Sequence, residues 1–196
     1  MAKIVPVDNG SKRDVVIKSA AAMFRDKGFA ATSMRDIAEQ LGVEAPSLYN
    51  HITSKKEILG EICFGVAKMF IANLKEVESS SSSVLNKIES IIRFHISMMV
   101  EEYKSVYISD HEWKHLPEPY LIDFKNQRRN YRSKLAALLQ KGIDKGEVNP
   151  VNPHVAVLTI LSAIGGIDNW QRSSKKIDRK TLEENMVKLL IDGLKK

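Results

Sequence analysis

Apolar residues recur at intervals of three and four along nearly the whole chain, and this spacing restricts the fold more than any other feature of the sequence. Such spacing places apolar side chains on one face of an α-helix, whereas the strict alternation typical of half-buried β-strands is scarce. The sequence therefore predicts an all-α protein of about nine helices. We expect these helices near residues 12–28, 34–42, 45–51, 54–77, 84–101, 103–115, 119–142, 153–172 and 179–194.

Composition places the chain among ordinary globular proteins. Of its 196 residues, 43% are hydrophobic and 28% are charged, which is enough apolar material for a real core. No stretch approaches the roughly 18 uninterrupted apolar residues of a membrane span, and the N-terminus lacks the apolar segment of a signal peptide. The single cysteine, Cys63, rules out an internal disulfide. We therefore expect a cytoplasmic protein without a membrane partner.

Breaks in the helical pattern indicate two parts. The five serines at residues 79–83 favour a flexible loop, because they are small and polar. Several helix starts carry capping patterns or a proline in the first turn. These are Ser11 with Asp14, Ser33 with Asp36, Ser54 with Glu57, and Asn152 with Pro153. We expect a small head at residues 1–55 and a larger helical body at residues 56–196.

The stretch TSMRDIAEQLGVEAPSLYNHITSKKEIL, residues 32–59, has the pattern of a helix-turn-helix. Its inward-facing positions are apolar: Ile37, Ala38, Leu41, Val43 and Leu48. Gly42 falls at the turn, where a positive φ is easily adopted by glycine. A short turn between two such helices matches the unit whose second helix enters the major groove of DNA. Because this geometry also occurs in other folds, spacing alone leaves a purely structural turn as an alternative.

The second helix of this unit exposes short polar and aromatic groups, which suit base edges and phosphates. These residues are Ala45, Pro46, Ser47, Tyr49, Asn50 and His51. Lys55 and Lys56 follow at a helix N-terminus, where a backbone phosphate can bind. The net charge of +6 is compatible with a nucleic-acid partner. Packing of Tyr49 and an internally bonded His51 remain the structural alternatives.

From about Arg13 to Leu59 the chain resembles the N-terminal domain of TetR-family transcriptional repressors. The resemblance is carried by FRDKGF, TSMRDIA, LGV, LYNH and SKKE. It implies that Ser33 and Arg35 touch phosphate with Met34 between them, that the helix from Ala45 to His51 reads bases, and that Tyr49 and Lys55 anchor the DNA backbone. Ile52 stands where the family usually has an aromatic residue, and we expect this to change packing under the recognition helix.

The resemblance implies that residues 1–55 form the DNA-binding domain and residues 56–196 a ligand-binding and dimerisation domain. It also implies a homodimer, and therefore a palindromic operator. The segment 153–172 is apolar nearly all round, so it must be buried in a core or against a partner. The segment 179–194 is amphipathic. Paired with their twofold mates, these two helices would form a four-helix dimer interface, as the family implies.

The body also resembles, more faintly, the TetR branch that senses acyl-CoA thioesters, through EWKHLPEPY, FKNQRRNYRSK and IGGIDNWQR. The candidate ligand-binding residues are Met98, Trp113, Tyr120, Phe124, Arg128, Arg132, Asn169, Trp170 and Arg172. Guanidinium groups bind phosphates bidentately, so the arginines suit a CoA nucleotide. A plain aromatic core and a solvated basic face are the structural alternatives. The predicted effector is a small hydrophobic molecule or an acyl-CoA that releases the repressor from DNA.

One motif suggests a different function. In HEWKH, residues 111–115, a continuous helix would place His111 and His115 on one face with Glu112 beside them, as in zinc hydrolases. A working site needs a third ligand, but the sequence that follows lacks the usual H-x-x-G-x-x-H continuation, and only His154 lies downstream. We therefore expect no metal, no cofactor and no catalytic residue, and retain a zinc-dependent hydrolase as the alternative function.

Overall fold

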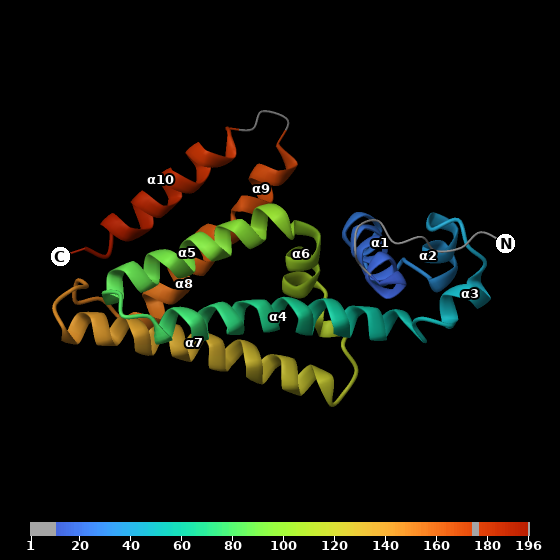
Figure 1. Ribbon diagram of the computed structural model, residues 1–196, viewed down its shortest axis with the longest axis horizontal. Helices are drawn as coiled ribbons and strands as arrows, with labels where there is room; N and C mark the ends of the chain where they lie inside the picture. Colours follow the sequence, from blue (N-terminus) through green and yellow to red (C-terminus); the bar gives the residue numbers. More distant parts are fainter. Residues whose placement is uncertain (1–10, 174–176, 196) are drawn as a thin grey trace. The chain divides into compact units, whose positions relative to one another are not determined.

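The computed structural model describes residues 11–173 and 177–195, and within these ranges its regular elements are ten α-helices and one 3-10 helix (Figure 1). They are α1 (Lys12–Lys27), α2 (Met34–Gln40), α3 (Ala45–Tyr49), α4 (Lys55–Ser79), α5 (Val84–Glu101), α6 (Tyr103–His111), η1 (Trp113–His115), α7 (Tyr120–Asp144), α8 (Pro153–Gly165), α9 (Ile167–Arg172) and α10 (Arg179–Asp192). The predicted all-α fold is confirmed. No helix in the described ranges is both long and apolar enough to cross a bilayer.

The chain forms two compact units. The first contains the described residues up to Val66 together with Lys104–Lys125, and the second contains Ala67–Tyr103 together with the described residues from Asn126 onward. Helices α4 and α7 are continuous in sequence through both units. The domain boundary predicted after residue 55 remains a proposal.

Two helices of the first unit begin at the capping boxes that the sequence predicted. The Ser11 hydroxyl accepts the Asp14 N–H at 3.2 Å, and the Asp14 carboxylate accepts the Ser11 N–H at 2.7 Å. Ser33 and Asp36 repeat this arrangement at the start of α2, with 3.2 and 2.7 Å. Each box pairs backbone donors that the helix itself leaves unpaired.

The start of α4 differs from the prediction in one partner. Ser54 accepts the Glu57 N–H at 3.2 Å, as a capping box requires. The Glu57 carboxylate, however, accepts the Thr53 N–H at 2.9 Å and the Thr53 hydroxyl at 2.6 Å. Thr53 rather than Ser54 therefore completes the cap. At α8 the prediction is confirmed, because the Asn152 side chain accepts two backbone N–H groups.

The helix predicted over residues 153–172 is divided in two. Helix α8 ends at Gly165, Gly166 caps it, and α9 begins at Ile167. Two successive glycines have a low helix propensity, so interrupting the helix here costs little free energy. A Cβ added at Gly166 would lie 3.0 Å from the Ala163 carbonyl oxygen, so the junction is also closely packed.

Helix α8 is buried on one face only. Val157, Ile160 and Ile164 are buried, and α8 packs against α5 in the second unit. Val155 and Leu158 are 59% and 66% exposed. Burial in the core, one of the two predicted possibilities, is therefore confirmed for one face of α8. Burial of the exposed apolar side chains against a partner stays a prediction.

A close approach of two segments in the second unit depends on Gly142. Val84 and Val148 are buried beside it, and a Cβ added at Gly142 would meet their side chains at 2.9 and 2.6 Å. The Glu147 carboxylate accepts the Val84 N–H at 2.6 Å, which ties the start of α5 to the segment after α7.

We predict that Gly142→Ala destabilises the protein by about 1–3 kcal/mol, because the methyl group must displace both valines. The matched control is Gly65→Ala in α4, where an added Cβ meets nothing within 4 Å. We expect this control to gain about 0.5–1 kcal/mol, since alanine is the better helix former. Urea unfolding of both variants measures the difference. Equal stability of the two variants would contradict the close packing at Gly142.

Candidate functional site

Helices α2 and α3 form the predicted helix-turn-helix. Ile37, Ala38 and Leu48 are at most 2% exposed, so the two helices are packed together through apolar side chains. Gly42 has a φ of +65°, the left-handed conformation that the turn requires. The Val43 N–H donates to the Ala38 carbonyl at 3.0 Å, which closes the turn onto α2. The helix-turn-helix prediction is confirmed.

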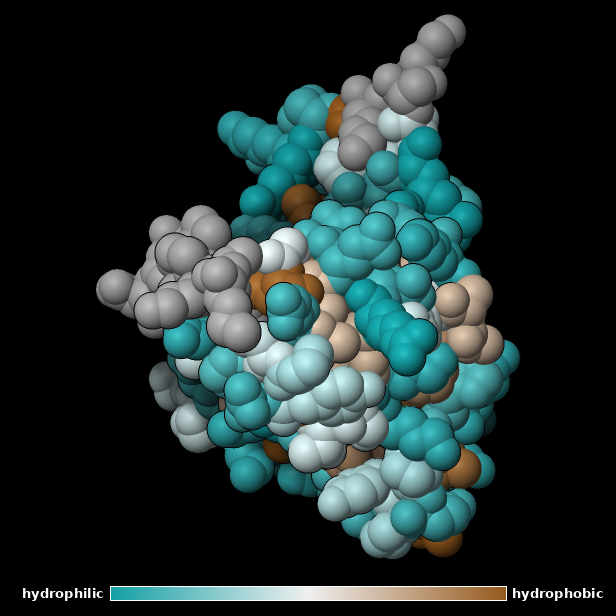
Figure 2. All heavy atoms as spheres, turned by 90° about the vertical axis from the view of Figure 1, so that its right-hand side faces the viewer, coloured by the Kyte–Doolittle hydropathy of each residue, from teal (hydrophilic) through white to brown (hydrophobic). Residues whose placement is uncertain are grey.

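The predicted DNA-contact residues lie on or next to these helices. Ser33, Arg35, Pro46, Tyr49 and Asn50 are exposed, and Met34, Ala45, Ser47, His51 and Lys55 are half-buried. The ring of Tyr49 is not packed away, because the residue is 50% exposed. Figure 2 shows the face that carries α2 and α3, where hydrophilic residues cover most of the surface. Their individual contacts with DNA stay predictions.

Lys55 has a role within the fold that the sequence did not indicate. Its ammonium group donates to the carbonyl oxygens of Phe29, Ala30 and Thr32, at 2.9, 3.1 and 2.8 Å. It also lies 4.7 Å from the centre of the Phe29 ring, within range of a cation–π interaction. Lys55 therefore holds the turn that leads into Ser33 and α2.

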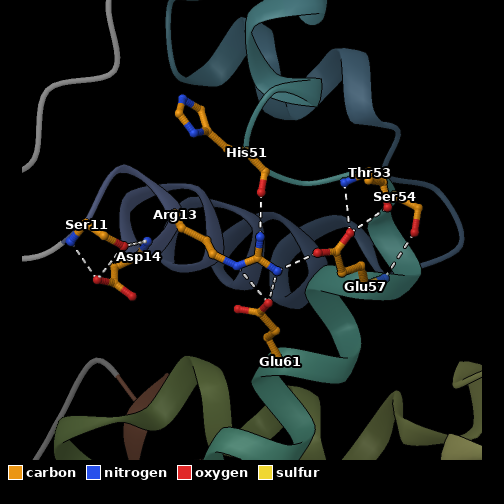
Figure 3. A network of polar contacts seen from close by, with 8 residues as sticks. All are labelled: Ser11, Arg13, Asp14, His51, Thr53, Ser54, Glu57 and Glu61. Atoms are coloured by element: carbon orange, nitrogen blue, oxygen red, sulfur yellow. Dashed lines mark hydrogen bonds and ion pairs between the residues drawn. The ribbon is translucent and has the colours of Figure 1, made fainter.

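Arg13 ties the end of the recognition helix to α4, as Figure 3 shows. Its guanidinium donates to the His51 carbonyl at 2.5 Å and to the Glu57 carboxylate at 2.5 Å, and it pairs with Glu61 as well. Hydrogen bonds from Thr53 and then Arg13 lower the pKa of Glu57 to about 2. Because a planar guanidinium can serve several acceptors at once, one side chain links three elements.

Three predicted ligand-binding residues gather in the first unit. The Phe64 ring, on α4, lies 5.6 Å from the Phe124 ring and 6.2 Å from the Tyr120 ring. Phe124 in turn lies 6.3 Å from Trp113, and Lys125 extends over the Trp113 ring at 5.7 Å. Phe64 was not among the predicted residues. The only signal for it in the sequence was an aromatic residue within the helix predicted for this segment.

The other predicted ligand-binding residues belong to the second unit, where several contact the protein itself. Arg172 pairs with Asp168, which also accepts the Tyr103 hydroxyl. The Trp170 indole N–H donates to the Ile177 carbonyl at 3.0 Å. Of the remaining members, Met98 is buried, Arg128 is half-buried, and Arg132 and Asn169 are exposed. Their contacts with a ligand stay predictions.

A cavity in the second unit lies between α5, α7 and α8, and none of the predicted residues lines it. It measures about 20 Å³ and is lined by Ile88, Ile91, Ile92, His95, Leu135, Leu138, Leu139, Val157, Ile160 and Leu161. The pattern along each helix gave no signal of it, because these positions look like ordinary core residues. A cavity depends on how three helices pack together.

His95 is the polar member of this lining. Its Nε2 lies 2.7 Å from the Tyr131 hydroxyl, and its ring stacks on Phe70 with 4.3 Å between centres. Burial lowers the pKa of His95 to about 4, so the imidazole is neutral at pH 7. Burial likewise raises the pKa of Tyr131. This neutral pair can hydrogen-bond an uncharged oxygen but offers no counter-charge to a carboxylate.

This depressed pKa predicts a loss of stability in acid. The unfolded chain binds a proton at His95 near pH 6.5, whereas the folded protein binds it only near pH 4, so unfolding becomes easier as the pH falls between these values. The loss reaches roughly 3 kcal/mol. In His95→Phe we expect the unfolding free energy to vary less between pH 7 and pH 5 than in wild type. Urea titrations at both values measure this slope, and parallel slopes would contradict a neutral buried His95.

The HEWKH residues do not form one helical face. Helix α6 ends at His111, and η1 begins at Trp113 after a break at Glu112. The His111 ring stacks on Tyr107 at 4.2 Å, while His115 pairs with Glu112 at 3.3 Å. Among the described residues, no group of three or more His, Cys, Asp or Glu side chains is placed to hold a metal ion. The continuous helix on which the zinc hypothesis rested was a wrong prediction.

The fold and this site define a helix-turn-helix DNA-binding protein. Residues 16–62 match the family described as bacterial regulatory proteins of the tetR family, and residues 81–194 match the tetracyclin repressor-like C-terminal domain. The second match alone spans more than half of the chain. The chain therefore belongs to the TetR family of transcriptional regulators.

Relatives and solved structures agree with this assignment. The transcriptional repressor KstR2 of Mycolicibacterium smegmatis is 28% identical over 151 residues, 76% of this chain and 74% of the relative. The structure of the ketosteroid regulator KstR2 of Mycobacterium tuberculosis has a TM-score of 0.88 at 22% identity, covering 99% of this chain and 100% of that one. AibR in complex with isovaleryl coenzyme A and operator DNA has a TM-score of 0.81 at 22% identity, covering 92% and 98%.

Proposed function

We propose that this protein is a ligand-responsive transcriptional repressor that binds a palindromic operator as a homodimer. A small hydrophobic molecule or an acyl-CoA releases it from DNA. The observation that carries the proposal is α3, which presents exposed side chains from a helix-turn-helix in a chain of the TetR family. We expect the protein to act in the cytoplasm.

The DNA-contacting surface follows from exposure and chemistry. Tyr49 and Asn50 are exposed at the end of α3, and Pro46 is exposed in its first turn. These side chains are placed to meet base edges and the sugar–phosphate backbone. Ser33 and Arg35 are exposed at the start of α2, where the Arg35 guanidinium supplies a positive charge for a backbone phosphate.

Exposed apolar side chains on α8 and α10 support the homodimer. Val155 and Leu158 on α8 are 59% and 66% exposed, and Leu189 on α10 is 75% exposed. Large apolar groups left at the surface of these helices are what a surface covered by a partner would present. Each copy would contribute the same face to a twofold interface, so the two heads would read related half-sites.

The effector part rests on the cavity between α5, α7 and α8. Its lining is apolar apart from His95, and the His95–Tyr131 pair supplies a neutral hydrogen-bonding site beside it. At about 20 Å³ it has room for roughly one water-sized molecule, so an effector with a hydrocarbon chain or ring would have to widen it. Arg128 lies one helical turn before Tyr131 on α7, on the same face. A CoA thioester has both an acyl chain and phosphates, and AibR, a structural neighbour, is described with isovaleryl coenzyme A. A hydrophobic molecule without phosphates is the other effector class.

Selection of genomic DNA fragments by the purified protein tests the proposed function. At moderate salt we expect one or a few near-palindromic sites to be recovered. Tyr49→Ala should weaken binding to the recovered site about tenfold or more, because it removes an exposed recognition-helix side chain. Ile122→Ala is the matched control, since Ile122 is 53% exposed in the same unit but lies outside the helix-turn-helix. Recovery of no selective site would contradict the proposal.

The dimer is tested by sedimentation. We expect wild type to sediment as a dimer at micromolar concentration and Leu158→Lys to shift it towards monomer, since a lysine ammonium would have to be desolvated at the interface. Ser90→Lys, an exposed change on α5, is the control and should remain dimeric. If Leu158→Lys sediments as wild type does, α8 is not the interface.

A further inference from the structure

Within the first unit, side chains from several elements contact the Phe29 ring. Phe29 lies in the turn between α1 and α2 and is 4% exposed. Phe24 packs edge-on against it at 5.0 Å, and the Lys55 ammonium lies 4.7 Å from its centre. The His115 ring stacks on it with 5.2 Å between centres and 24° between planes. The second histidine of the HEWKH motif therefore contacts the turn that precedes the helix-turn-helix.

This turn sets the position of the N-terminus of α2. The Thr32 hydroxyl donates to the Gly28 carbonyl at 2.9 Å, and Lys55 binds three carbonyls between Phe29 and Thr32. Ser33, the N-cap of α2, follows directly. A shift of the turn would therefore move Ser33 and Arg35, the residues at the start of α2 for which contacts with the operator backbone are proposed.

Residue His115 is itself held in place by neighbours from outside the helix-turn-helix. Glu112 lies 3.3 Å from its Nε2, and Trp113 of the same 3-10 helix packs near Phe124 at 6.3 Å. Phe124 contacts Phe64 on α4 at 5.6 Å. In the sequence, α5 and α6 precede η1, and α7 follows it. Helices that build the second unit therefore lead directly, along the chain, to the group that contacts Phe29.

We propose that His115 is a positioning residue for DNA binding, whose ring holds the turn from Gly28 to Thr32 so that Ser33 and Arg35 at the start of α2 meet the operator backbone. The inference rests on the proposed function and deepens it. Displacement of η1 withdraws the ring, loosens the turn and lowers operator affinity. The HEWKH motif thus has a role that uses the shape of an imidazole ring rather than its capacity to bind a metal.

Ring shape and charge can be separated by substitution. Phenylalanine at position 115 retains a flat ring for stacking, leucine retains only apolar volume, and alanine removes both. His111 provides a matched control, because it belongs to the same motif but stacks on Tyr107 instead of the turn. Phe29→Leu removes the other ring of the pair.

The experiment measures the dissociation constant of each variant for the selected operator and for an unrelated duplex, by fluorescence anisotropy at one salt concentration. Urea unfolding of the same samples verifies that each is folded. We expect His115→Ala and His115→Leu to weaken operator binding fivefold or more, His115→Phe to stay within twofold of wild type, and His111→Ala to match wild type. Adding His115→Ala to Phe29→Leu should weaken binding no further, because the contact is already lost.

The outcomes separate the two claims. If the folded His115→Ala and His115→Leu proteins bind the operator as wild type does, even with lower stability, the contact is only structural and this inference is wrong while the proposed function stands. If wild type itself does not distinguish the operator from the unrelated duplex, the proposed function fails and this inference fails with it. Faster hydrogen exchange of the amides at residues 29–36 in His115→Leu would support the positioning role, and unchanged exchange there would contradict it.

Discussion

The recognition helix α3 has five residues, and the rest of the DNA-binding surface depends on how it is held. A helix this short is not stable alone, because it forms too few hydrogen bonds to offset the cost of nucleation. Leu48 and Ile52, at most 1% exposed, anchor it from below, and Arg13 binds the His51 carbonyl just beyond its end. Arg13 in turn pairs with Glu57 and Glu61 on α4.

Side chains on α1 and α4 hold α3 in place, so the position of α3 depends on its attachment to those two helices. Lys55, at the start of α4, holds the turn before α2 in the same way. The recognition helix and the N-terminus of α2 are thus both tied to the first turns of one long helix. Any change at that end of α4 would reach α3 and the start of α2 together, the two segments for which DNA contacts are proposed.

Local features of the sequence predicted the head well. Side-chain caps such as Ser33 with Asp36, the left-handed Gly42 and the apolar positions under α3 depend on residues close together in the chain, so their pattern is legible. Contacts between residues far apart in the sequence could not be predicted in this way. Lys55 was placed as a phosphate ligand by its position at a helix N-terminus, whereas its carbonyl partners lie in another segment. The cavity beside His95 escaped notice because it arises from three helices that look apolar one at a time.

Hydroxyl-radical footprinting of the protein on its operator would show directly where the two copies of α3 of a dimer lie on DNA. We expect two equivalent protected regions related by a twofold axis, with the two recognition helices in major grooves about 34 Å, or a multiple of this, apart. The protection should disappear from both half-sites together when α3 is altered. A single protected region, or a footprint that survives the loss of the exposed α3 side chains, would contradict this expectation.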